Sequence, residues 1–247
     1  REYLDKDGNP SMGLEAMVKS VARKAASYGK RGKKPAAKQK RFVIITGARV
    51  GKTKLGESMA KSSGSAYINS DDIFGHIPEY RNGQGYYDVI DEVNMIAHEA
   101  MNELAEDGTN IIVENTGDSL SALANLVASF KNRGYKVDVV NLRLAGGFRQ
   151  RIIAAAKEFA EDGPRSGSWV RTKDQLDIGE SPTSNHVAVE FNFQQDGGLG
   201  GAVTVEAEDG SYTLVAKTGH LNPGTARAIR KATGGRLAAI GKILSGG

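Results

Sequence analysis

One stretch, residues 42–55, constrains the fold of this chain more than any other. It is FVIITGARVGKTKL: an apolar, β-branched run, a turn of small residues, then Gly51-Lys52-Thr53 and a helical pattern that starts at Lys54. Strand, glycine-rich loop and helix in this order are typical of a P-loop, in which backbone N–H groups and the helix N-terminus bind phosphate. The sequence therefore predicts a nucleoside triphosphate site, with Lys52 on the β- and γ-phosphates and Thr53 on Mg²⁺.

The loop departs from the usual glycine spacing of this motif. A glycine is expected five positions before Gly51, where Thr46 stands, and Gly47 comes one position later. Either Thr46 takes the first glycine position of a full-length loop, or the loop is one residue short. Arg49 also places a large cation where close approach of backbone to phosphate favours a small residue. The alternative is a strand-to-helix turn without a ligand. The predicted phosphate-binding residues are Thr46, Gly47, Ala48, Arg49, Val50, Gly51, Lys52, Thr53 and Lys54.

Strands and helices alternate through the middle of the chain. We predict strands over residues 43–45, 65–70, 110–115 and 135–142, and helices over residues 54–62, 86–107, 120–132 and 148–160. This alternation indicates an α/β fold of the kinase-like P-loop NTPase type, with helices on both faces of a parallel sheet. Further strands are predicted over residues 186–193, 202–207 and 212–217, the last two as an antiparallel hairpin, with a basic helix opening at 222–225.

The N-terminal segment differs from this core. Residues 12–28 have apolar side chains at helical spacing, which predicts an amphipathic helix. Residues 30–41 combine glycine, proline and dense positive charge, so we interpret them as a linker, either a solvated connector or a contact for a polyanion. We expect a helix and basic linker over residues 1–41 and a kinase domain over 42–247, with its core in 42–168 and an extension in 169–247.

Composition narrows the classes of protein. The chain has no cysteine, which excludes disulfides, thiolate metal sites and cysteine nucleophiles. No apolar run approaches the roughly 18 residues of a membrane span, and the first residues lack the apolar core of a signal peptide. We expect a cytoplasmic protein that does not bind membranes.

Acidic residues follow two of the predicted strands. Asp72 lies after the second strand, where it could accept the proton of an acceptor hydroxyl during phosphoryl transfer. Glu114 ends the third strand and could hold either the acceptor hydroxyl or a water on the metal. The ends of parallel strands share one edge of the sheet, where ligands bind. The alternative is that Asp71 or Asp72 caps the following helix.

Arginines occur in the segment after the fourth strand. Arg149 and Arg151 open the helix predicted there, and Arg165 lies in the glycine turn that follows it. Such a helix and turn could fold over the triphosphate, since the guanidinium group binds phosphate oxygens in pairs. For each arginine, a solvated helix face is the alternative.

Several of these motifs resemble one known family. TGARVGKTKL, INSDDIF, NIIVENTG and a helix ending in EDGPRSG are similar to the corresponding motifs of the zeta-toxin family of P-loop kinases, the toxins of bacterial toxin–antitoxin pairs. The resemblance covers residues 42–168, with a weaker similarity at 202–217. The register with Thr46 in the first glycine position agrees with the family. Asn115, where a glycine is usual, is a further departure.

The resemblance implies a kinase that uses ATP and Mg²⁺ to phosphorylate a sugar hydroxyl of a UDP-linked amino sugar, and an antitoxin partner over the triphosphate site. A related effector, which acts inside a host cell, instead phosphorylates the ribose of NAD. The implied site residues are Lys52 and Thr53 for triphosphate and metal, Asp72 as general base, Glu114, Thr116 and Arg149 for the acceptor, and Arg151 and Arg165 as phosphate clamps.

Two other functional classes compete with this one. A 5′-hydroxyl kinase of nucleic acids could use the basic stretch 30–41 as its electrostatic footprint, although that stretch has no interleaved aromatic residues for base stacking. A non-catalytic binding module would explain the irregular loop at Thr46 and Arg49.

Overall fold

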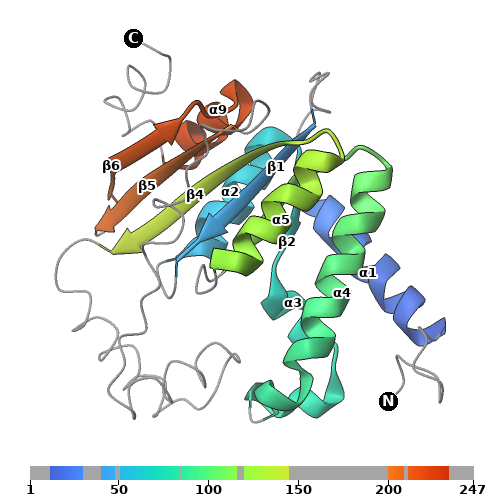
Figure 1. Cartoon of the computed structure of the whole chain (residues 1–247). Helices are drawn as coiled ribbons and strands as arrows, with labels where there is room; N and C mark the ends of the chain where they lie inside the picture. The colour runs from blue at the N-terminus through green and yellow to red at the C-terminus, as the bar shows by residue number, and fades with distance from the viewer. Residues whose placement is uncertain are drawn as a thin grey trace.

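The computed structural model describes residues 12–29, 40–47, 51–83, 85–115, 120–144, 200–208 and 211–233. Its elements are α1 (Met12–Gly29), β1 (Arg41–Thr46), α2 (Lys52–Ser63), β2 (Ala66–Ile68), α3 (Ser70–Phe74), the 3-10 helix η1 (Pro78–Gly83), α4 (Tyr86–Glu106), β3 (Ile111–Glu114), α5 (Leu120–Asn132), β4 (Lys136–Leu144), β5 (Gly201–Glu208), β6 (Ser211–Gly219) and α9 (Pro223–Ala232) (Figure 1). The helix predicted over 148–160 and the strand predicted over 186–193 lie outside the described residues. Within those residues, no helix is both long enough and apolar enough to cross a membrane.

The described strands form one sheet in the order β2-β3-β1-β4-β5-β6. The first five strands are parallel, and β6 pairs with β5 in the antiparallel direction. At the carboxyl edge, Ile45 is in register with Glu114 and Thr46 with Asn141. The predicted kinase-like parallel sheet with a C-terminal hairpin and helix is confirmed.

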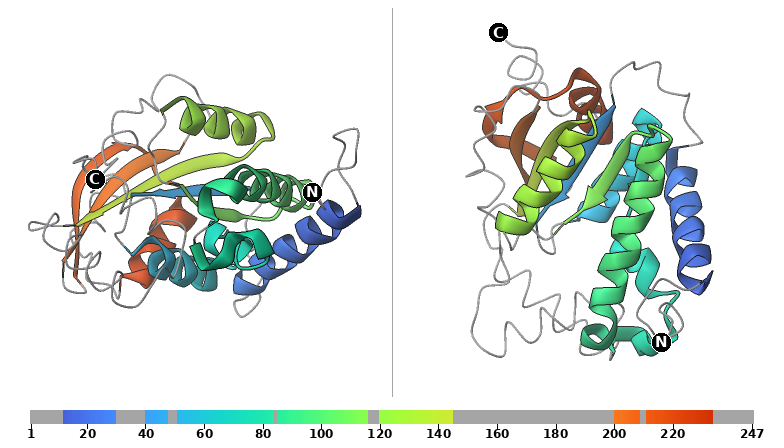
Figure 2. Two further views of the ribbon diagram at one scale, coloured as in Figure 1. Left: turned by 90° about the horizontal axis from the view of Figure 1, so that it is seen from below. Right: turned by 45° about the vertical axis from the view of Figure 1, so that its right-hand side comes forward.

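Helices cover both faces of the sheet, as the apolar strands require. Phe42 and Ile44 of β1 belong to the core that contains α4 and α5, and Val43 and Ile45 to the core that contains α2 and α9. Figure 2 (left) shows α5 on one side of the sheet and α2 and α9 on the other. The central strand is therefore buried on both faces, and a ligand site is expected beyond its carboxyl end.

Helix α1 covers the edge strand β2. It contacts β2 and α4, and its apolar side, including Leu14, Val18 and Val21, belongs to the core on the α4 face (Figure 2, right). A covered edge is protected from pairing with another chain. The N-terminal helix predicted from the sequence is therefore part of the core, and the boundary predicted at residue 41 stays a prediction.

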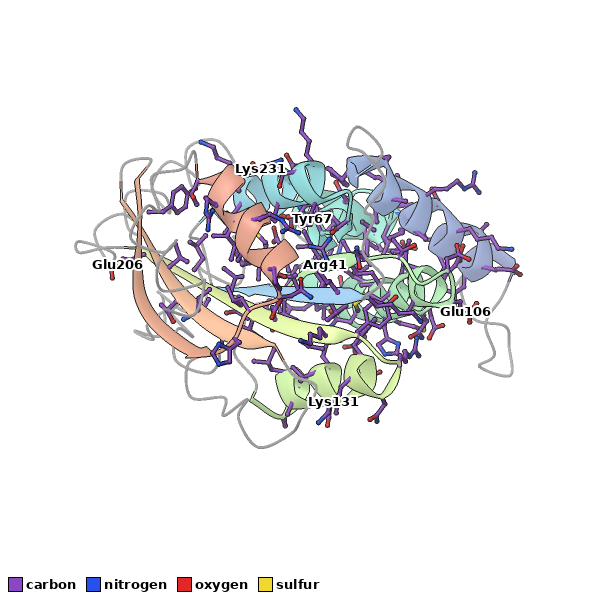
Figure 3. The ribbon with its side chains drawn as sticks, turned by 90° about the horizontal axis from the view of Figure 1, so that it is seen from above. Arg41, Tyr67, Glu106, Lys131, Glu206 and Lys231 are labelled. Atoms are coloured by element: carbon purple, nitrogen blue, oxygen red, sulfur yellow. The ribbon has the colours of Figure 1, made fainter. Side chains whose placement is uncertain are left out.

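A buried carboxylate ties α9 to the sheet. Asp138 of β4 accepts hydrogen bonds from the backbone N–H of Gly201 at 3.1 Å and of Asn222 at 3.2 Å, and from the Thr225 hydroxyl. Burial raises the pKa of Asp138 to about 6, although these bonds and the nearby charge of Arg41 act to lower it. Figure 3 shows Arg41 beneath α9.

The placement of Arg41 in the linker was wrong. The residue is the first of β1 and is 6% exposed. Its charge interacts with that of Asp138. The local sequence around residue 41 does not reveal this interaction, because Asp138 lies far away in the chain.

Candidate active site

The predicted phosphate-binding loop joins β1 to α2 at the carboxyl edge of the sheet. Gly47 follows β1 with a φ of 117°, and Gly51 is the N-cap of α2 with a φ of 83°. Both values lie in the left-handed region that favours glycine. Lys52 and Thr53 then begin α2, whose N-terminal N–H groups favour an anion. This arrangement agrees with a P-loop.

Thr46 belongs to the strand. It is the last residue of β1, is 1% exposed, and its Oγ1 donates to Oδ1 of Asn141 at 3.0 Å. Gly47 is the first residue with left-handed backbone. Residues 48–50 lie outside the described residues, so the register with Thr46 in the first glycine position stays a prediction.

Four side chains converge where β3 ends beside α2. Lys52 Nζ donates to the carbonyl of Gly47, the Tyr67 hydroxyl donates to Oε1 of Glu114, and Thr53 hydrogen-bonds to the same carboxylate. Burial raises the pKa of Glu114, while Lys52, Tyr67 and Thr53 act to lower it. Figure 3 shows Tyr67 beneath α2. The cluster joins the cation and hydroxyl of the loop to an acidic residue of the neighbouring strand.

The chemistry of this cluster suits a magnesium-bound triphosphate. Mg²⁺ prefers oxygen ligands and, in nucleotide sites, is bound by few protein oxygens together with phosphates and water. The Thr53 hydroxyl and the Glu114 carboxylate are such oxygens, and Lys52 supplies positive charge for phosphate. The contact with Thr53 favours the second of the two roles predicted for Glu114, which is to hold a water on the metal.

The two aspartates of α3 have different surroundings. Asp72 accepts hydrogen bonds from Lys24 Nζ and the Tyr28 hydroxyl of α1, both at 2.8 Å. Asp71 is exposed, and its charge acts to raise the pKa of Glu114. Asp72 is therefore directed to α1, on the outer side of β2, and Asp71 acts on the cluster at β3.

The alternative that Asp71 or Asp72 caps the helix is wrong. The N-cap of α3 is Asn69, whose side chain accepts a hydrogen bond from the Asp71 N–H at 3.0 Å.

The structure places part of the predicted site. It brings together Lys52, Thr53 and Glu114, with Lys54 exposed on the first turn of α2. The predicted residues outside the described part of the chain are Ala48, Arg49, Val50, Thr116, Arg149, Arg151 and Arg165.

Sequence reasoning missed Lys24, Tyr28 and Tyr67. The two α1 residues contact Asp72 across more than 40 positions of the chain, a separation for which no local pattern exists. Tyr67 lies in a predicted strand, but its role depends on Glu114, 47 positions later.

The family model described as Zeta toxin matches residues 25–163, more than half of the 247-residue chain. The chain belongs to the Zeta toxin family. The match begins inside α1, so it includes a part of the N-terminal segment that the motif resemblance left out. Together with the kinase-like P-loop fold, membership of the Zeta toxin family supports a kinase-type, nucleotide-binding phosphotransferase.

Solved structures share the fold of this Zeta toxin family protein. One, from a characterization of the PezAT chromosomal toxin-antitoxin system of Streptococcus pneumoniae, has a TM-score of 0.53 at 14% identity and covers 94% of this chain and 96% of its own. Another, the AvrRxo1-ORF1:-ORF2 complex, has a TM-score of 0.52 at 14% identity and covers 92% of this chain and 74% of its own. No curated protein matches the chain in sequence.

Proposed function

We propose that this protein is an ATP-dependent kinase that transfers the γ-phosphate to a sugar hydroxyl of a UDP-N-acetyl amino sugar, and that it acts as a toxin. The observation that carries the proposal is the cluster of Lys52, Thr53, Tyr67 and Glu114 beside the N-terminus of α2. A triphosphate with its γ-phosphate near this cluster would lie within reach of the carboxylates of α3, the groups needed on the acceptor side.

In the proposed reaction, the acceptor oxygen forms a bond to the γ-phosphorus and the bond from that phosphorus to the β–γ bridging oxygen breaks. ADP leaves, and an α3 aspartate accepts the hydroxyl proton. Lys52 and the α2 N-terminus stabilise the charge on the phosphates. Mg²⁺, held by Thr53 with Glu114 on a metal-bound water, would supply further neutralisation of that charge. Thr116 and Arg149 are proposed to contact the acceptor, and Arg151 and Arg165 to clamp phosphate.

The sequence assigns the general base to Asp72, and the surroundings of the two aspartates favour Asp71 as a second candidate. Both oxygens of Asp72 already accept bonds from α1, whereas Asp71 is exposed and acts electrostatically on Glu114. An acceptor held at the sheet edge could therefore reach the exposed carboxylate of Asp71. We propose Asp71 as the base and Asp72 as a support for α3.

An antitoxin protein is the proposed partner. The structure from the PezAT toxin-antitoxin system supports this by its similar fold, and a partner over the triphosphate site would block ATP. The proposed place of action is the cytoplasm, and the comparisons give no support to delivery into a host cell.

The experiment is incubation of the full chain with ATP, Mg²⁺ and a panel of UDP-sugars, NAD and nucleosides, followed by mass spectrometry. The expected product is a UDP-N-acetyl amino sugar with one added phosphoryl group. A phosphorylated NAD instead would assign the effector-type reaction, and a phosphorylated 5′-hydroxyl the nucleic-acid class. If no acceptor is phosphorylated and calorimetry detects no binding of ATP with Mg²⁺, the proposed kinase function is wrong. The non-catalytic binding module is then the remaining class.

A further inference from the structure

Helix α1 contacts the carboxylate of Asp72 through two side chains on one of its faces. Lys24 Nζ lies 2.8 Å from Oδ1 and the Tyr28 hydroxyl 2.8 Å from Oδ2. Lys24 and Tyr28 are four positions apart, so they are neighbours on the helix surface. The side chains of Lys24 and Asp72 are 45% and 25% exposed, and an ion pair of this exposure contributes little to the stability of the fold. Either partner can therefore be replaced in a folded protein.

Tyr28 continues this contact toward the phosphate loop. Its ring packs edge-on against Tyr67, with centroids 5.2 Å apart, and Tyr67 donates to Glu114, which hydrogen-bonds to Thr53. Burial raises the pKa of both tyrosines, so both hydroxyls stay protonated and able to donate. A continuous set of contacts thus leads from α1 to the first turn of α2.

Two glycines allow the close approach on which these contacts depend. A Cβ on Gly29, the last residue of α1, would lie 2.6 Å from backbone atoms of Gly64 and Ser65. A Cβ on Gly56 of α2 would lie 2.4 Å from the Tyr67 ring. The end of α1 and the tyrosine therefore lie directly against α2 and the turn that follows it, with little room to shift.

We propose that Lys24 and Tyr28 are positioning residues of the phosphoryl-transfer site. They hold Asp72, and through it they fix the rotation of α3, so that the adjacent Asp71 faces Glu114 and the phosphate loop. Consecutive helical residues point in directions about 100° apart, so a fixed Asp72 determines the direction of Asp71. Neither Lys24 nor Tyr28 touches the reacting atoms. This inference rests on the proposed kinase function.

The test compares kcat and KM of the full chain and its variants with ATP and UDP-N-acetylglucosamine, and with NAD as a second acceptor. Tyr28→Phe and Lys24→Met should each lower kcat by about 3- to 10-fold, in line with the loss of one partly exposed hydrogen bond of ordinary strength, and leave the KM for ATP unchanged. Tyr28→Phe should have no further effect in the Asp72→Ala background, because both changes remove the same contact. Lys24→Arg, which keeps the charge, should restore most of kcat.

Matched controls separate position from stability. Lys19→Met removes an exposed ion pair with Glu15 on the same helix, and Tyr87→Phe changes a tyrosine that is 57% exposed; neither should change kcat. If Tyr28→Phe and Lys24→Met lower the unfolding midpoint but leave kcat within twofold, or if their effects add to that of Asp72→Ala, the inference is wrong. If the unaltered chain phosphorylates neither acceptor, the proposed function fails, and the inference fails with it.

Discussion

The hydroxyl of Thr46 donates a hydrogen bond of 3.0 Å to Oδ1 of Asn141, which joins the end of β1 to β4 beneath the phosphate loop. Both residues are 1% exposed. The Asn141 amide in turn donates to Oγ1 of Thr204 on β5 at 3.4 Å. A row of buried polar side chains therefore crosses three strands at the edge where the loop begins, and it explains why a threonine is suited to the last position of β1.

Thr46→Val should lower the free energy of unfolding by about 1–3 kcal/mol, because it removes a buried hydrogen bond to Oδ1 of Asn141. Thr46→Ser keeps the hydroxyl and should lose less stability. The measurement is urea unfolding of the three proteins. Equal stability of the valine variant and the unaltered chain would contradict the importance of this bond.

Lys52→Met should weaken ATP binding by about 10- to 100-fold, the effect of removing a charged hydrogen bond to phosphate. Titration calorimetry with ATP and Mg²⁺ provides the measurement. Lys61→Met, in the last turn of the same helix, is the matched control and should bind ATP as the unaltered chain does. A similar loss in both variants would indicate a general charge effect rather than a contact at the loop.

The buried Asp138 should make stability depend on pH. Burial raises its pKa to about 6 in the folded protein, against 3.8 for an ordinary aspartate, so the folded chain holds this proton more tightly than the unfolded chain. The resulting stabilisation is complete below about pH 4 and is lost as the pH rises through 6, by at most about 3 kcal/mol.

Thermal unfolding of the unaltered chain and of Asp138→Asn between pH 4 and 7 measures this effect. As the pH rises, the unaltered chain should lose stability relative to Asp138→Asn. A shift in the opposite direction would mean that the hydrogen bonds and Arg41 outweigh burial.

Gly29→Ala should destabilise the protein by about 1–3 kcal/mol, since the new methyl group would meet the backbone at Gly64 and Ser65. Gly13→Ala, at the exposed start of the same helix, should be neutral or slightly stabilising. Chemical denaturation measures the free energy of unfolding of both variants. Equal stability of Gly29→Ala and Gly13→Ala would mean that the end of α1 can move away from α2.

The sequence predicted the parts of the fold that local patterns determine. The β-branched run before Gly51 and the glycine before Lys52 specify a buried strand and a left-handed helix cap, and both are present. The sequence did not predict that α1 lies against β2, or that Arg41 faces Asp138. These contacts join residues far apart in the chain, and an isolated amphipathic helix or basic residue has the same pattern whether it packs or is solvated.

Contacts between distant residues also limit how much of the candidate site can be predicted from the sequence. A strand end followed by two aspartates predicts an acidic site, but it does not predict which aspartate faces the ligand. That depends on the rotation of α3, which here is related to the contacts of Asp72 with Lys24 and Tyr28.

Replacement of each aspartate separately should distinguish their roles. Asp71→Asn should keep ATP affinity and lower kcat by about 10²-fold or more, the loss expected for a general base. Asp72→Asn should lower kcat by about 3- to 10-fold, as expected for a positioning residue whose hydrogen bonds are weakened by the loss of its charge. Steady-state kinetics with ATP and UDP-N-acetylglucosamine, together with calorimetry for ATP, provides both quantities. Asp88→Asn, on the exposed first turn of α4, is the matched control. If Asp72→Asn instead causes the larger loss, the assignment made from the sequence is correct, and Lys24 and Tyr28 then hold the base itself.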